Sequence, residues 1–178
     1  VLWRLNDYSI LDIQGLIEKL IGELDFEGNF KGTGGILRLL SSELCTNAVF
    51  NAPRGKSEDK SRYAHIERNE EIILSEKEEV NFCFFSDKEK FGVYVKDNFG
   101  SLDFETVVHY IYRGFNEKDV LEDKSGGHGA GMYMTFKNTD RFIVNSRKDV
   151  ITEFILVLDR EKRMKKFSSL SDLKSLIN

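Results

Sequence analysis

The stretch LRLLSSELCTNAVFNA, residues 37–52, decides how this chain folds. Its apolar residues recur at helical spacing on one face: Leu37, Leu40, Leu44 and Ala48. Glu43, Asn47 and Asn51 recur at every fourth position beside that face, which stacks one carboxylate and two amides along the helix. Asn is a weak helix former, and Glu is costly to bury. The polar line therefore indicates either a solvated helix edge or a site that meets a polar partner.

The composition bounds the class of protein. With 178 residues, 40% apolar and 31% charged, the chain fits one globular domain with a sizeable core. A formal net charge of −4 argues against a nucleic-acid-binding surface, which is usually basic. No apolar run approaches the roughly 20 residues that span a bilayer, and no signal peptide is expected. Cys45 and Cys83 lie far from any His cluster and predict reduced core thiols in a cytoplasmic protein.

Hydrophobic periodicity predicts strands and helices that alternate along the chain. Strands are expected at residues 1–5, 80–85, 91–95, 141–146 and 151–158. Helices are expected at residues 10–24, 37–52, 103–115 and 132–136, with a glycine-rich connection at 28–35. The second helix should end before Pro53, because the residue before a proline is pushed out of helical dihedral angles. The third helix is followed by a polar segment, residues 116–124, which we interpret as a lid.

Two segments differ in composition from the rest. Residues 57–71 are highly charged and poor in apolar residues, which predicts an exposed insertion. Residues 160–178 combine a basic linker with an amphipathic C-terminal helix, which is either a strap on the core or an element that docks a partner. The remaining residues, 1–159, are expected to form one domain.

A glycine cluster precedes the fourth predicted helix. Gly127, Gly129 and Gly131 form G-x-G-x-G, and glycines are needed where backbone N–H groups close on phosphate oxygens without clashes from Cβ atoms. Taken alone, the same pattern can be a tight turn. Earlier in the chain, Asp97 ends a predicted strand and is followed by a turn that contains Gly100.

The order of these features resembles the GHKL ATP-binding fold. The Thr46-Asn47-Ala48 sequence after Glu43 is most similar to that of the anti-sigma-factor serine/threonine kinases. The resemblance covers residues 1–159 as a histidine kinase-like ATP-binding domain. It implies a two-layer α/β sandwich, in which a mixed, mostly antiparallel sheet carries helices on one face. It also implies ATP and Mg²⁺ as cofactors and makes a homodimer plausible.

The resemblance assigns roles to single residues. Asn47 would give its side-chain oxygen to Mg²⁺, a cation that prefers hard oxygen ligands. Glu43 would be the catalytic residue, which orients or deprotonates the attacking hydroxyl. Asp97 would accept a hydrogen bond from the adenine amino group. The cofactor-binding residues implied are Asn47, Asn51, Asp97, Gly100, Gly127, His128, Gly129, Ala130, Gly131, Met132 and Thr152. Four cations are further candidates for phosphate or partner contacts: Arg54, Lys56, Arg113 and Lys124.

The sequence departs from the family pattern at three positions. Phe99 and Ser101 stand where the motif after Asp97 has glycines, and Ile151 stands where a Gly commonly precedes the Thr. The expected function is an anti-sigma-type serine/threonine kinase that phosphorylates a protein antagonist and regulates a sigma-like partner. Two alternatives stay open: the catalytic domain of a sensor histidine kinase, and a nucleotide-dependent binding module without transfer activity. The departures favour nucleotide binding over turnover.

Overall fold

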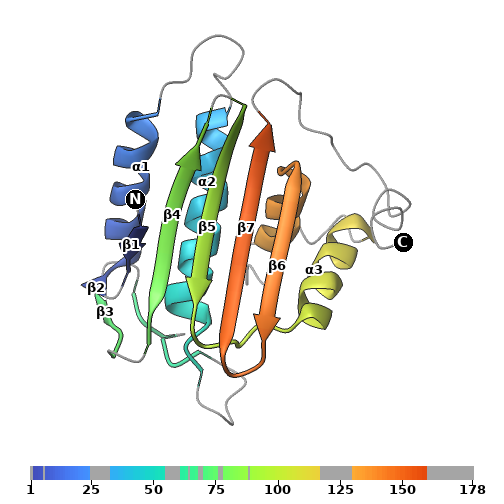
Figure 1. Ribbon diagram of the computed structural model, residues 1–178. Helices are drawn as coiled ribbons and strands as arrows, with labels where there is room; N and C mark the ends of the chain where they lie inside the picture. Colours follow the sequence, from blue (N-terminus) through green and yellow to red (C-terminus); the bar gives the residue numbers. More distant parts are fainter. Residues whose placement is uncertain are drawn as a thin grey trace.

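The computed structural model describes residues 2–5, 7–24, 33–54, 61–63, 65–67, 70–75, 78–87, 89–116 and 130–159 (Figure 1). Its strands are β1 (Leu2–Arg4), β2 (Asp7–Tyr8), β3 (Ile72–Ile73), β4 (Val80–Ser86), β5 (Lys90–Asp97), β6 (Arg141–Arg147) and β7 (Ile151–Asp159). Its helices are α1 (Ile10–Gly22), α2 (Thr33–Thr46), α3 (Phe104–Asn116) and α4 (Ala130–Lys137), and a π-helical turn, η2 (Asn47–Asn51), continues α2. The expected lid, residues 116–124, and the tail, residues 160–178, lie outside the described residues except for Asn116.

The main sheet has the strand order β1-β4-β5-β7-β6, and β2 pairs with β3 in a separate two-stranded sheet. Every strand pair of the described residues is antiparallel, so the mixed sheet expected from the sequence is not seen there. The reason is the order of the strands. Because β7 returns from β6 and inserts beside β5, it separates the two strands that run in the same direction.

The α/β class is confirmed. Figure 1 shows α1 and α2 covering one face of the sheet, with α3 beside β6, and no described helix on the opposite face. Alternate residues of β5 and β7 point into the core, as the period of a strand requires. Phe91, Val93 and Val95 of β5 are buried, as are Phe154, Leu156 and Leu158 of β7. They pack with apolar residues of the helices, including Ile13, Ile17, Leu37, Leu40 and Leu44.

The helix predicted at residues 37–52 differs from the observed one at both ends. It begins at Thr33, so Gly34 and Gly35 lie in its first turn rather than in a connection. At its other end the hydrogen bonding changes from α to π, and the Ala52 N–H donates to the carbonyl of Asn47 at 2.8 Å. The regular helix ends before Pro53 as expected, but Ala52 itself keeps helical dihedral angles (φ −72°, ψ −36°). The expectation that the proline would displace this residue from the helical region is therefore wrong.

The other elements fall close to their predicted positions. Helix α1 begins after Ser9, whose hydroxyl accepts from the Asp12 N–H while the Asp12 carboxylate accepts from the Ser9 N–H, a capping box. Strands β4 and β5 form the predicted hairpin, with Val80 opposite Asp97. Helix α4 begins at Ala130, two residues earlier than expected, and so includes the end of the glycine cluster. In the segment expected to be an exposed insertion, Tyr63 is half-buried against the core.

Candidate functional site

The polar line on α2 and η2 is a continuous hydrogen-bonded chain. The Asn47 Nδ2 donates to Glu43 Oε1 at 2.9 Å, and the Asn51 Nδ2 donates to Asn47 Oδ1 at 2.7 Å. An ionised carboxylate only accepts hydrogen bonds. Asn47 must therefore present its nitrogen to Glu43 and its oxygen to Asn51. The sequence prediction that these three side chains share one line of the helix is confirmed.

Glu43 is partly buried and takes part in the more buried of these two hydrogen bonds. Burial raises the pKa of the Glu43 carboxyl, and the hydrogen bond from Asn47 lowers it by less. Burial disfavours the charged form of a carboxyl group, and a carboxylate with a raised pKa is a stronger base. The arrangement can therefore take a proton from a hydroxyl held next to it.

Helix α4 approaches Glu43 so closely that any side chain at the contact would have to displace the Glu43 carboxylate. A Cβ atom placed on Gly131 would lie 1.9 Å from Glu43 Oε1 and 2.0 Å from its Cδ. Ala130 and Met132 lie in the same first turn of α4. The structure thus joins the N-terminal turn of α4 to the polar line of α2, and a helix N-terminus favours negative charge nearby.

Asp97 ends β5 and is 5% exposed. Its Oδ1 accepts hydrogen bonds from the backbone N–H groups of Phe99 at 3.0 Å and Gly100 at 3.2 Å. Burial raises the pKa of Asp97 to about 6, against the opposing effect of those two N–H groups. The hydroxyl and the backbone N–H of Thr152 also lower the pKa of the Asp97 carboxyl, each by less than the N–H groups of Phe99 and Gly100.

Thr152 is the partner of Asp97 in the β5–β7 ladder and is 1% exposed. Its hydroxyl lies near the carboxylate and lowers the pKa of Asp97, but the two groups lack the geometry of a hydrogen bond. The Thr152 Oγ1 is therefore buried without a hydrogen-bond partner among the described residues. A ligand donor or acceptor that reached it would remove a desolvation cost of about 1–3 kcal/mol.

Gly100 is required by the backbone that faces it. Its φ is +60°, and a Cβ atom would lie 2.3 Å from the Arg147 carbonyl oxygen and 2.7 Å from the Ile151 nitrogen. The turn after β5 thus packs directly on the turn between β6 and β7. Phe99 is half-buried against the core.

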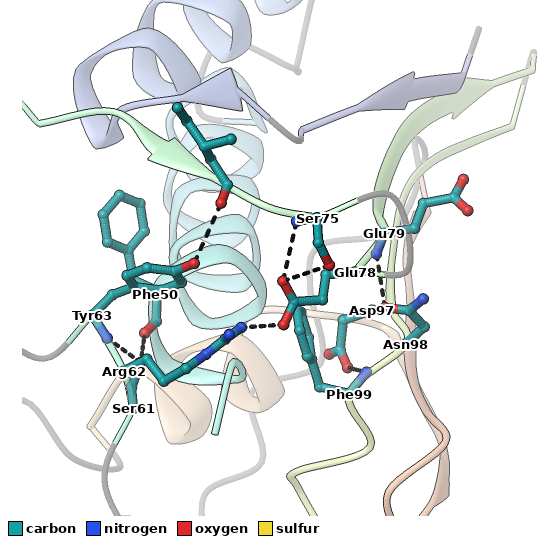
Figure 2. A network of polar contacts seen from close by, with 11 residues as sticks. Phe50, Ser61, Arg62, Tyr63, Ser75, Glu78, Glu79, Asp97, Asn98 and Phe99 are labelled. Carbon is teal, nitrogen blue, oxygen red and sulfur yellow. Dashed lines mark hydrogen bonds and ion pairs between the residues drawn. The ribbon is translucent and has the colours of Figure 1, made fainter. Parts of the chain in front are cut away.

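Sequence reasoning missed a second polar network at the same end of the sheet, which Figure 2 shows. Arg62 forms an ion pair with Glu78, whose carboxylate also accepts from the Ser75 hydroxyl at 3.0 Å. The Glu79 N–H donates to Asn98 Oδ1 at 2.8 Å, one residue after Asp97. These contacts join segments far apart in the chain, so no periodic signal could have predicted them.

The structure brings part of the predicted site together. Strand β5 packs against η2, and α2 packs against α4, which places Asp97, Asn47 and Gly131 on elements that touch. Of the predicted residues, Gly127, His128 and Gly129 lie outside the described residues, as do Lys56 and Lys124. Arg54 is exposed and donates its Nε to the Asn51 carbonyl at 3.4 Å.

Two hollows on the described surface lie elsewhere. One, of about 630 Å³, is lined by Asp103, Glu105, Thr106, His109, Tyr110 and Arg113. The other, of about 370 Å³, is lined by Gln14, Gly15, Glu18, Arg38 and Ser42. Neither is lined by Asn47 or Asp97, and residues 117–129, which precede α4, are outside the described part of the chain. Arg113 therefore lies in a hollow on α3 that the predicted site does not include.

Comparison with known proteins adds no assignment. No protein-family model matches the chain, and no curated protein sequence matches it. Within the described residues, no helix has the length and apolar character needed to cross a membrane.

Proposed function

We propose that this chain binds Mg·ATP at a GHKL-type site and acts as an anti-sigma-type serine/threonine kinase on a protein antagonist. The observation that supports the proposal best is the contact between Glu43 and Gly131, with Asn47 hydrogen-bonded to the same carboxylate. This contact joins Glu43 of α2 to the end of the glycine cluster, as the resemblance requires.

The residues present fit the metal. Mg²⁺ takes few protein ligands and completes its shell with phosphate and water oxygens, so one amide oxygen is a sufficient anchor. Asn47 Oδ1 accepts one hydrogen bond, from Asn51, and has a second lone pair. When bound, the cation would neutralise charge on the transferred phosphoryl group. Asn47 would hold it, while the first-turn amides of Ala130, Gly131 and Met132 would face the phosphates.

The residues present also fit an adenine base. The Asp97 carboxylate would accept from the exocyclic amino group, and the Thr152 hydroxyl, which lacks a hydrogen-bond partner among the described residues, is its neighbour on β7. A purine that carries a carbonyl instead of the amino group would place an acceptor against the carboxylate. We therefore expect adenine to be preferred over guanine.

The kinase activity depends on Glu43. Its carboxylate would orient a Ser or Thr hydroxyl of the antagonist and accept its proton as the hydroxyl oxygen attacks the γ-phosphorus. The bond between the γ-phosphorus and the β–γ bridging oxygen would break in the same step, and ADP would leave. A sigma-like regulator would be the second protein partner, and a homodimer is part of the same proposal.

Calorimetric titration with ATP, ADP and GTP, with and without Mg²⁺, tests the nucleotide site. We expect ATP and ADP to bind, Mg²⁺ to strengthen ATP binding, and GTP to bind far more weakly. If ATP gives no heat and no thermal stabilisation at millimolar concentration, the proposed function is wrong.

A second function, a nucleotide-dependent binding module without transfer, is favoured by one observation: the half-buried Phe99 packs against the core at a position where the GHKL motif has a glycine. Incubation of the protein with γ-labelled ATP and candidate antagonists distinguishes the two. A kinase transfers label to Ser or Thr, and Glu43→Gln abolishes the transfer while ATP binding remains. A module transfers none, and Glu43→Gln leaves its partner binding unchanged.

A further inference from the structure

Four residues of the candidate site are joined in a row, by one close contact and two hydrogen bonds. This path runs from Gly131 in the first turn of α4 to the Glu43 carboxylate, from there to the Asn47 amide, and from that amide to Asn51 at the end of η2. Glu43 and Asn47 have chemical roles in the proposed function. Gly131 and Asn51 stand at the two ends of the path, where each limits the freedom of its neighbour.

At one end, Gly131 sets the place of the carboxylate. A methyl group at this position would lie 1.9, 2.0 and 2.5 Å from Oε1, Cδ and Oε2 of Glu43. These atoms are the end of a flexible side chain, and Gly131 is helical, so an alanine would fit the backbone and displace the carboxylate instead. The hydrogen bond from Asn47 would then lose its acceptor.

At the other end, Asn51 sets the direction of the Asn47 amide. The Asn51 side chain is exposed, so core packing does not fix its position. It still donates a hydrogen bond of 2.7 Å to Asn47 Oδ1. The π-helical turn supplies the backbone for this contact, and such turns occur frequently at functional sites. The nitrogen and the oxygen of the Asn47 amide each make one of these hydrogen bonds. The oxygen therefore has one lone pair left, which points in one direction.

We propose that Asn51 and Gly131 are positioning residues: they aim Asn47 Oδ1 at the metal and hold the Glu43 carboxylate beside it, without touching the nucleotide through their side chains. This inference rests on the proposed function and changes the role of Asn51 from a cofactor contact to a support. Groups that orient a metal ligand commonly change metal affinity about 10- to 100-fold when they are removed.

The test compares four variants of the whole chain. Asn51→Leu removes the donor at nearly constant shape, and Asn51→Gln restores a donor at helical spacing. Gly131→Ala adds the methyl group that displaces Glu43. Gly15→Ala is the matched control, because a Cβ atom at this helical glycine meets nothing within 4 Å.

The first measurement is ATP affinity by calorimetry, in Mg²⁺ and in EDTA. In Mg²⁺, we expect Asn51→Leu and Gly131→Ala to bind ATP about 10-fold more weakly than the wild type. In EDTA, their ATP affinities should differ from the wild type by less than about twofold. Asn51→Gln and Gly15→Ala should resemble the wild type. If Asn51→Leu weakens ATP equally in EDTA, Asn51 contacts the nucleotide and the inference is wrong.

The second measurement needs no nucleotide: the Asn47 side-chain amide protons by NMR. The proton donated to Glu43 should resonate downfield in the wild type, move toward the free-amide position in Gly131→Ala, and exchange faster with water in Asn51→Leu. Unchanged Asn47 signals in both variants overturn the positioning inference alone. Absence of ATP binding in the wild type overturns the proposed function, and the two failures are thereby distinguished.

Discussion

Asp97 and Thr152 are directly opposite each other on β5 and β7, and both side chains are almost completely buried. The carboxylate accepts from two backbone N–H groups, whereas the Thr152 hydroxyl has no hydrogen-bond partner among the described residues. A buried charge and a buried orphan hydroxyl side by side are costly to the folded protein. Both costs can be measured, and under the proposed function both should change when adenine binds.

The first prediction concerns the pH dependence of stability. Because burial raises the pKa of Asp97 to about 6, from an ordinary value of 3.8, the folded state binds a proton more readily than the unfolded state. The cost of the buried charge is fully present above pH 6 and disappears as the pH falls toward 4. Asp97→Asn should therefore raise the free energy of unfolding at pH 7.5 by roughly 2–3 kcal/mol, and much less at pH 4.

Urea unfolding of wild type and Asp97→Asn between pH 4 and pH 8 checks this difference. Asp103→Asn is an informative control, because the backbone N–H of Thr106 lowers the pKa of the Asp103 carboxyl. Its carboxylate stabilises the fold above its ordinary pKa, so this variant should be less stable at pH 7.5. A difference for Asp97→Asn that does not depend on pH would contradict the prediction.

The second prediction separates stability from binding at Thr152. Thr152→Val replaces the unpartnered hydroxyl by a methyl group of similar volume. At pH 4, where the Asp97 carboxyl is mostly protonated in the folded protein and no carboxylate is stabilised by the hydroxyl, the free energy of unfolding should rise by about 1 kcal/mol. If the hydroxyl contacts the adenine, the same variant should bind ATP about 5- to 10-fold more weakly, as expected for one lost hydrogen bond. Thermal unfolding and calorimetry measure the two effects.

Thr135→Val provides the matched comparison for Thr152→Val. The Thr135 hydroxyl, on α4, is also buried without a partner among the described residues, and it is not part of the candidate site. Its replacement should stabilise the protein by a similar amount and leave ATP affinity unchanged. If both variants lost the same ATP affinity, the loss in Thr152→Val could not be assigned to a contact between its hydroxyl and the adenine.

The third prediction concerns the turn after β5. Gly100→Ala would force a left-handed backbone on alanine and press its Cβ against the Arg147 carbonyl at 2.3 Å. Backbone atoms cannot move aside as a side chain does, so we expect a loss of about 2–4 kcal/mol in the free energy of unfolding, measured in urea. Asp149→Gly is the control, since Asp149 has φ +58° and its replacement relieves strain instead. A loss of less than about 1 kcal/mol for Gly100→Ala would contradict the structure.

The fourth prediction concerns the two thiols. Cys45 is fully buried, and burial raises the pKa of its thiol, whereas Cys83 is only partly buried on β4. Because the thiolate is the reactive form, iodoacetamide should label Cys83 first, and Cys45 only after unfolding. Peptide mass spectrometry of timed samples measures this order. In urea the two rates should become similar, and equal rates in the native protein would be inconsistent with the buried position of Cys45.

Much of the fold could be predicted because strands and helices impose local periods. The alternation of residues 91–95, the helical spacing from Ile13 to Ile21, and the hairpin between β4 and β5 are all properties of short segments. The strand order could not be predicted in this way. Whether β7 lies beside β5 or outside β6 depends on how the helices pack, which no local pattern records.

The candidate site was likewise predictable within one helix but not where elements meet. Glu43, Asn47 and Asn51 could be placed on one line from spacing alone, because a helix brings every fourth residue together. The end of that helix was not predicted in detail: the π-helical hydrogen bond from Ala52 to Asn47 lies in η2, which packs against β5.

The periods of separate segments were thus enough to predict strands that alternate with helices, and spacing within one helix selected the polar line of α2. Only the packed chain shows that Gly131 contacts Glu43, that Thr152 faces Asp97, and that Gly100 must lack a side chain because the Arg147 carbonyl is so close. These are contacts between elements far apart in the sequence. Their distances follow from the burial of a shared core, which is a property of the whole domain and not of any one stretch.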